Sequence, residues 1–219
     1  MQIPQKFQAL VDKSAYAAVA RLGVVRLFKT GAVLMSEGDS GRSIFVLLSG
    51  SVVVYSSDEL GRQIIHGENE AECLLGEMSL GGETRSATVQ VTRDAVCAII
   101  QIAQLVAQLQ TDPDLAMRLI MLLISRSRRA TDIGRQLALD SVYRRVARLL
   151  QTADRLPGKV HDTSSQSGLR IELSQQEIAS RVGASRDMVS KIFKTLLAGG
   201  YLKKDGRDFY LARSLPRDW

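Results

Sequence analysis

The sequence predicts an α+β chain: a glycine-punctuated β-roll (jelly roll), then a long helix, then a small basic winged helix-turn-helix. Three observations predict this order. Short apolar runs between residues 23 and 103 alternate with glycine turns. No proline interrupts residues 114–139. Residues 174–193 have the spacing of two short helices joined by a tight turn.

The β-roll is expected from strands at 44–48, 52–55 and 96–102, which are separated by glycine-containing turns. Gly38, Gly50 and Gly76 are expected to hold tight or positive-φ turns, because glycine lacks the Cβ that opposes such a backbone.

The long helix is predicted over residues 112–139, with Asp112 as N-cap and Pro113 at the first helical position. Its apolar stripe, from Leu115 through Leu122, is wider than one domain face needs. We therefore expect a two-stranded coiled coil in a homodimer. The alternative is a core helix in a monomer.

Asp140 is expected to cap a further helix. This helix is expected to turn Val142, Val146, Leu149 and Leu150 inward and Arg144, Arg145 and Arg148 outward. A loop is expected at 156–167. The resulting domains are a β-roll (1–111), a dimerisation helix (112–139) and a winged helix-turn-helix (140–219).

The two-helix motif begins with Ser174 and Glu177, which have the spacing of a capping box, and Ser185 can cap its second helix. That helix buries Val189, Ile192, Phe193 and Leu196, and it presents Arg186, Asp187, Ser190, Lys191 and Lys194 outward. Gly199–Gly200 end the helix, and Asp205–Gly206 predict a hairpin wing. The alternative is a generic helical hairpin with a solvated polar face.

The positive charge is concentrated at the C-terminal end. Residues 141–219 hold 15 Lys and Arg against 8 Asp and Glu, whereas residues 1–111 hold 9 against 11. This asymmetry favours a polyanion, double-stranded DNA, as the partner of the basic module over an anionic membrane surface. The sequence shows no membrane span or signal peptide and only two cysteines, Cys73 and Cys97, so we expect a reduced, cytoplasmic protein without a zinc site.

Three segments, in this order, resemble the catabolite activator/cyclic-AMP receptor and fumarate–nitrate regulator (Crp–Fnr) superfamily of bacterial transcription factors. They are EGDSGRSIFVLLSGSVVVY (37–55), GEMSLGGETRSATV (76–89) and LSQQEIASRVGASRDMVSKIFKTL (173–196). The resemblance implies a homodimer that binds a two-fold-symmetric operator and works with RNA polymerase.

The segment 76–89 resembles the family's phosphate-binding cassette. The resemblance implies that Glu77, with backbone around Gly76, holds a ribose, that Arg85 and Ser86 hold a cyclic phosphate, and that Met78 lies in the same site. The chemistry agrees, since a carboxylate accepts from hydroxyls and a guanidinium donates to phosphate. The alternative is an Arg85 ion pair with Glu77 or Glu83 that only ties the loop.

The effector is less sharply predicted. The loop 78–84 is shorter than in most cyclic-nucleotide binders, and Arg129 and Ala130 stand where relatives place hydroxyl groups that read adenine. Either Thr131 substitutes for these hydroxyl groups, or the base is read otherwise, or the effector is not cyclic AMP. Arg128 and Arg129 suit a more anionic ligand. The candidates are cyclic AMP, cyclic di-GMP and no effector, with no obligatory cofactor. The absence of cysteine before Cys73 excludes the family's iron–sulfur type, and His66 and Cys73 have unsuitable spacing for haem. Glu70, Glu72 and Glu77 should raise the pKa of Cys73 and disfavour a thiol switch.

For DNA, the resemblance places Arg186, Asp187 and Lys191 at base-reading positions, where Arg suits guanine and Asp suits cytosine. The phosphate contacts expected are Ser174, Gln175, Gln176 and Ser185, and the wing adds Lys203, Lys204 and Arg207. Solvated charge is the alternative for the wing.

No phosphate-cradling loop or catalytic constellation indicates an enzyme. A protein-binding adaptor remains the rival to a DNA-binding regulator.

Overall fold

The structure is a computed structural model that describes residues 3–152 and 169–216. It contains two compact units, Met1–Ser56 with Ile65–Arg128, and Ser57–Ile64 with Arg129–Trp219. Each is described by itself. No helix within the described residues is long and apolar enough to cross a bilayer. The loop expected at 156–167 lies outside the described residues.

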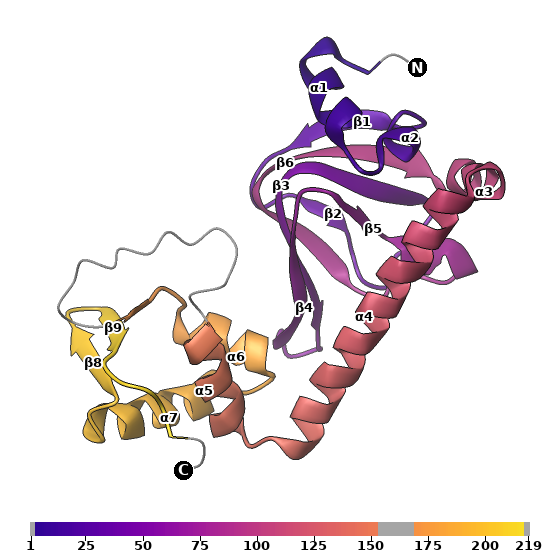
Figure 1. The fold of residues 1–219 in the computed structure, drawn as a ribbon. Coiled ribbons are helices and arrows are strands. Elements are labelled where there is room, and N and C mark those ends of the chain that lie inside the picture. The colour runs from indigo at the N-terminus through magenta and orange to yellow at the C-terminus, as the bar shows by residue number, and fades with distance from the viewer. Residues whose placement is uncertain (1–2, 153–168, 217–219) are drawn as a thin grey trace. The chain divides into compact units, whose positions relative to one another are not determined.

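The β-roll is confirmed as a single antiparallel sheet (Figure 1). Its strands are β1 Val24–Phe28, β2 Val33–Met35, β3 Ser43–Ser57, β4 Gln63–Glu70, β5 Cys73–Leu75 and β6 Thr88–Gln101. They follow the order β1-β6-β3-β4, with β2 on β6 and β5 on β3. Register shifts interrupt the long β3–β6 ladder between Leu47 and Val52, and such bulges bend strands as a roll requires. Gly38, Gly50 and Gly76 all have positive φ, as predicted.

Strand β3 is buried on both faces, which explains its unbroken run of apolar residues. Ile44 and Val46 belong to one core cluster, while Phe45 and Leu47 belong to another inside the roll. The first cluster is covered by helices α1 Gln5–Lys13, α2 Ala17–Ala20, α3 Ile102–Thr111 and the start of α4. Helices α1, α2 and α3 were not predicted from the sequence. The last strand was predicted to reach residue 102, but it ends at Gln101 and Ile102 begins α3.

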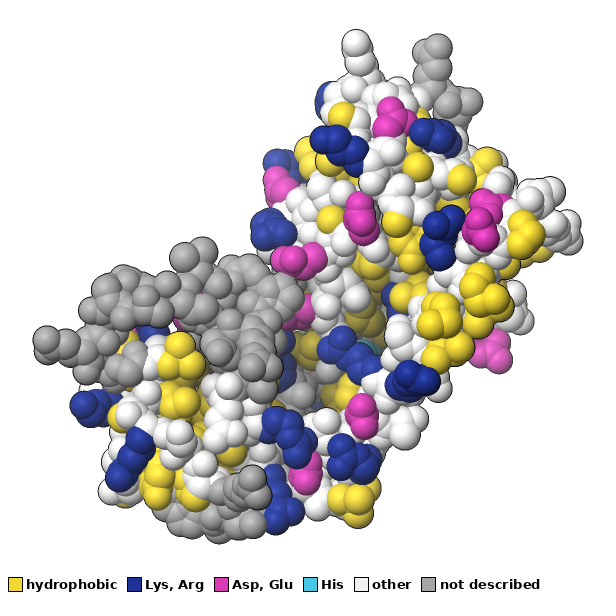
Figure 2. Space-filling model, in the orientation of Figure 1, with side chains coloured by type: hydrophobic (Ala, Val, Ile, Leu, Met, Phe, Trp, Pro, Cys, Tyr) yellow, Lys and Arg dark blue, Asp and Glu magenta, His cyan; other side chains and the backbone are white. Residues whose placement is uncertain are grey.

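The long helix is α4, Pro113–Leu139. Asp112 caps it as predicted, because its Oδ1 accepts from the Leu115 N–H at 2.9 Å. Leu115 and Leu119 are buried against the roll. A second set of large apolar side chains stays exposed, and we call it the exposed α4 face: Met117, Ile120, Met121, Leu123 and Ile124. Figure 2 shows hydrophobic side chains gathered on this helix.

The C-terminal unit is a winged helix-turn-helix, as predicted (Figure 1). Its elements are α5 Val142–Thr152, β7 Leu169–Ile171, α6 Gln175–Val182, α7 Arg186–Ala198, β8 Leu202–Asp205 and β9 Asp208–Leu211. The hairpin turns at Gly206, and β7, which the sequence analysis missed, completes a sheet in the order β7-β9-β8. Val189, Phe193 and Leu196 of α7 are fully buried in the core.

Two predictions about the start of α5 were wrong. The cap is Ser141, whose Oγ accepts from the Arg144 N–H at 3.2 Å, while the Asp140 carboxylate pairs with Arg148 at 2.8 Å. Arg145 does not point into solvent. Its long stem reaches back, and its guanidinium donates to carbonyl groups at the ends of two helices.

Arg145 therefore acts as a C-cap for two helices at once. Nη1 donates to Asp140 O at 2.7 Å and to Gln136 O at 3.4 Å, and Nε donates to Val182 O at 2.8 Å. Carbonyls at a helix end have no partner within the helix and carry the negative end of its dipole, so a cation is favourable there. We call this arrangement the Arg145 clamp.

Arg145→Met should lower the free energy of unfolding of the C-terminal unit by about 1.5–3 kcal/mol, because it removes charged hydrogen bonds and keeps the stem. Urea unfolding followed by circular dichroism measures this. Arg207→Met, at an exposed position in the wing turn, is the control and should shift stability by less than about 0.5 kcal/mol. Equal stability of the two variants would contradict the clamp.

Candidate functional site

The cassette is built on a short helical turn between β5 and β6. This turn, η1 Glu77–Gly81, is flanked by Gly76 at φ +84° and Gly82 at φ +83°. Gly76 is also required by space, because a Cβ there would lie 2.4 Å from Arg85 Nη1. Gly41 is equally confined, as its Cβ would lie 2.3 Å from Ser79 Oγ. The backbone thus closes tightly around the Arg85 side chain.

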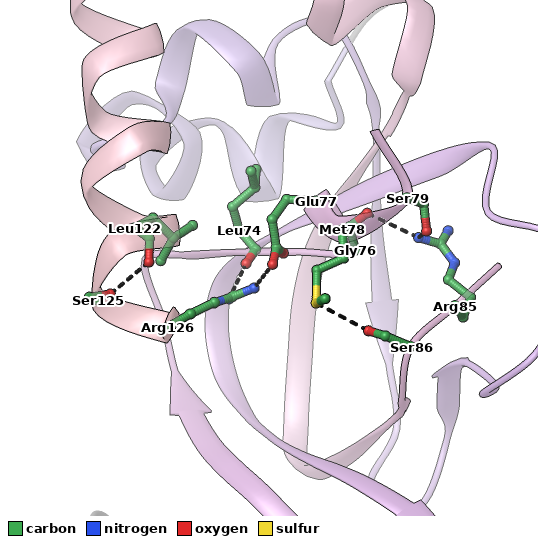
Figure 3. A network of polar contacts seen from close by, with 10 residues as sticks. All are labelled: Leu74, Gly76, Glu77, Met78, Ser79, Arg85, Ser86, Leu122, Ser125 and Arg126. Carbon is green, nitrogen blue, oxygen red and sulfur yellow. Dashed lines mark hydrogen bonds and ion pairs between the residues drawn. The ribbon is translucent and has the colours of Figure 1, made fainter. Parts of the chain in front are cut away.

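The Arg85 guanidinium is buried and holds this loop together (Figure 3). Nη1 donates to Ser79 Oγ at 3.2 Å and to Gly76 O at 3.3 Å, and Nη2 donates to Ser43 O at 2.5 Å. The acceptors of these three bonds are neutral, unlike the Glu77 or Glu83 partner considered from the sequence. Burial lowers the pKa of Arg85, while Asp39 and Glu77 oppose that shift.

Glu77 is 3% exposed, and its carboxylate forms an ion pair with Arg126 of α4 (Figure 3). Arg126 Nη2 also donates to Leu74 O at 2.6 Å. One guanidinium therefore joins α4 to both β5 and the cassette. A buried carboxylate without a partner would be strongly destabilising, and the Arg126 guanidinium is the cation that compensates Glu77.

Arg126 is the functional residue that the sequence analysis missed. A usable signal was present, because Leu115, Leu119, Leu122 and Arg126 follow one another at intervals of four, three and four. The two buried leucines at the start of this stripe mark the face of α4 that packs on the roll. A charged residue that continues such a stripe is expected to meet a buried partner.

Two further predicted effector residues lie at the rim of the cassette. Ser86 and Met78 are exposed, and the Ser86 hydroxyl donates to Met78 Sδ at 3.2 Å. A thioether is a weak acceptor, so this hydroxyl is readily available to a ligand. Thr131 is exposed on α4 and belongs to the second compact unit.

The two cysteines are shielded thiols. Burial raises the pKa of Cys73 to about 11, with a further contribution from Glu77 and opposition from Arg126. Burial likewise raises the pKa of Cys97 to about 12. The direction for Cys73 agrees with the sequence analysis, but burial is the main cause instead of the surrounding glutamates.

The helix-turn-helix has the predicted caps. Ser174 Oγ accepts from Glu177 N at 3.2 Å, and Glu177 Oε2 accepts from Ser174 N at 2.7 Å. Ser185 Oγ accepts from Met188 N at 3.2 Å. Each serine keeps its hydroxyl proton for a further acceptor such as phosphate. Gly183, at φ +62°, makes the turn between the two helices.

The outer face of α7 is open to solvent. Arg186, Asp187 and Lys191 are exposed, and Ser190 is half-buried. On α6, Gln176 is exposed and Gln175 is half-buried. The wing exposes Lys203 and Lys204, and Lys204 Nζ lies 5.7 Å from the centre of the Phe209 ring. These polar and mostly basic side chains occur on α6, α7 and β8, and groups of this kind contact bases and phosphates in DNA-binding proteins.

Comparisons with known proteins agree with this geometry. The model of the cyclic nucleotide-binding domain matches residues 25–112, and that of the Crp-like helix-turn-helix domain matches residues 144–213. The cAMP-activated global transcriptional regulator CRP of Salmonella typhimurium is 27% identical over 174 residues, which cover 78% of this chain and 81% of CRP. The cAMP-activated regulator Vfr of Pseudomonas aeruginosa is 29% identical over 187 residues, or 83% and 86% of the two chains.

Among solved structures, the c-di-GMP-responsive global regulator CLP of Xanthomonas campestris superposes with a TM-score of 0.78 at 26% identity. The match covers 89% of this chain and 96% of that one. A nucleotide-binding roll followed by a Crp-like helix-turn-helix defines a transcriptional regulator, which is a non-enzymatic class of protein. The chain belongs to the Crp–Fnr family of these regulators.

Iodoacetamide should modify Cys73 at pH 8 roughly two orders of magnitude more slowly than a free cysteine, because a raised pKa leaves little thiolate. The rate should still rise above pH 10, since the folded thiol ionises near pH 11. Mass spectrometry of the native protein measures both effects, with the urea-unfolded protein as control. Fast modification near neutral pH would contradict the raised pKa and favour a redox switch at Cys73.

Proposed function

We propose that this protein is a homodimeric transcriptional regulator whose affinity for a two-fold-symmetric DNA site is set by a cyclic nucleotide bound at the cassette. The observation that carries this proposal is the ion pair between the buried Glu77 carboxylate and the half-buried Arg126. It connects the carboxylate expected to receive the effector directly to α4. A ligand that engages Glu77 therefore acts on the helix without an intermediate element.

The cassette offers complementary groups to a cyclic nucleotide. The Glu77 carboxylate accepts from a ribose hydroxyl, and the exposed Ser86 hydroxyl donates to the phosphate. Arg85 takes part by exchanging one of its bonds to the Gly76 or Ser43 carbonyl for a phosphate oxygen, which is a stronger, charge-assisted acceptor. The site thus rearranges on binding, and the ligand's charge supplies the driving force.

Cyclic AMP and cyclic di-GMP are the two candidate effectors. The relatives CRP and Vfr are cAMP-activated, which supports the first. The second is supported by similarity to the c-di-GMP-responsive CLP and by exposed Arg128 and Arg129 on α4. Two phosphates need more cationic donors than one, and these arginines can provide them.

The exposed α4 face supports a homodimer. Its residues recur at three- and four-residue spacing, which is the seam of a two-stranded coiled coil. A second copy of the same helix would cover it symmetrically. Two recognition helices about 34 Å apart would then enter successive major grooves, as a two-fold operator requires. Effector binding at the cassette changes this spacing through α4, and transcription by RNA polymerase responds.

Glu77→Gln should weaken binding of the activating nucleotide by about tenfold or more, because the amide is a weaker acceptor and lacks the charge that pairs with Arg126. Calorimetry against cyclic AMP and cyclic di-GMP measures the affinity. Fluorescence anisotropy of a selected operator measures the linked change in DNA affinity. Glu83→Gln, on an exposed position of the same loop, is the control. If neither nucleotide binds or alters DNA affinity, the proposed effector class is wrong.

Met121→Glu combined with Ile124→Glu should convert the dimer to a monomer, because two charges per helix cannot be buried in an apolar seam. Sedimentation equilibrium should then report the chain mass of 24.0 kDa in place of twice that value. Val106→Glu changes an exposed residue of α3 and should leave the dimer intact. A dimer that survives the double substitution would show that another surface mediates association.

A further inference from the structure

The helix that faces DNA carries an exposed apolar side chain whose role remains to be assigned. Met188, in the first turn of α7, is 42% exposed. Among the described residues from α5 to β9, it is the one large apolar side chain in the exposed class. It belongs neither to the C-terminal core nor to the half-buried residues packed against that core. Met188 therefore contributes little apolar burial to the core of this unit.

Its position on the helix is well defined. Val189, Phe193 and Leu196 are buried and mark the inner side of α7, and Asp187 and Lys191 lie opposite them. At about 100° per residue, Met188 stands on one flank of that outer face, while Arg186 and Ser190 stand on the other. The bond from Met188 N to Ser185 Oγ fixes the turn from which the side chain extends.

The major groove offers one apolar feature to such a side chain, the C5-methyl group of thymine. Methionine cannot donate to a phosphate or to a base edge, so a contact with DNA at this flank gains free energy only by burying apolar surface. Its unbranched thioether adapts readily to a methyl group. Asp187, the next residue, is suited to accept from cytosine N4.

We infer that Met188 is a specificity-determining residue that contacts the methyl group of one thymine in each half-site, beside the base pair contacted by Asp187. This inference rests on the proposed function, since it requires that the outer face of α7 enters the major groove. It adds an apolar contact to the polar readout of Arg186, Asp187 and Lys191.

The test begins with selection of binding sites from a random DNA pool, with cyclic AMP, with cyclic di-GMP and without nucleotide. Each thymine of the selected site is then replaced singly by uracil, which removes only the methyl group. Fluorescence anisotropy should show that the wild type loses about threefold to fivefold in affinity at one thymine per half-site. Met188→Ala should bind the unmodified site about threefold to fivefold more weakly than the wild type does. Its affinity should not change when the same thymine is replaced by uracil.

Thr195→Ala is the matched control, because Thr195 is exposed two turns further along the same flank of α7. It should keep the wild-type response to uracil. The inference is overturned if no thymine is sensitive to its methyl group, or if the sensitivity persists in Met188→Ala. In either case a selected site would still support the proposed function. If the wild type selects no sequence under any condition, both proposals fail.

Discussion

The ion pair between Glu77 and Arg126 is the contact on which the arrangement of the sensing unit depends. Burial of a carboxylate at 3% exposure costs several kcal/mol unless a cation meets it, and that cation comes from α4. The same guanidinium satisfies the Leu74 carbonyl of β5. Roll, cassette and long helix are therefore joined at one point. Under the proposed function, a ligand hydroxyl at Glu77 would share the carboxylate with Arg126 and so change how firmly the helix is held.

Features with a local chemical signal could be predicted from the sequence. The Asp112 cap, the Ser174 and Glu177 capping box, and the Gly206 turn each depend on residues within a few positions of one another. Features that depend on distant partners could not. Helices α1 to α3 are short, and their apolar residues become informative only once the roll supplies a surface. Strand β7 has three residues and exists by pairing with β9.

In the candidate site, the types of the functional residues could be predicted, but their hydrogen-bond partners could not. The cassette residues could be named from sequence, since a carboxylate and a guanidinium suit the parts of a nucleotide. The hydrogen-bond partners of Arg85 could not be predicted from the sequence. They depend on the loop folding into the single turn η1, which brings Ser79 to the guanidinium. Helical periodicity alone placed Arg145 in solvent. It ignores the length of an arginine stem, which reaches carbonyls a turn or more away.

The Arg145 clamp has a consequence for how the ends of two helices move. Its bonds to Asp140 and Val182 join the end of α4 to the end of α6, so a small rotation at the Asp140 junction strains them together. Hydrogen bonds weaken steeply once their donor angle is lost, so both bonds favour the orientation in which α4 and α6 now end. One side chain thus couples the exit of the long helix mechanically to the helix that precedes the turn at Gly183.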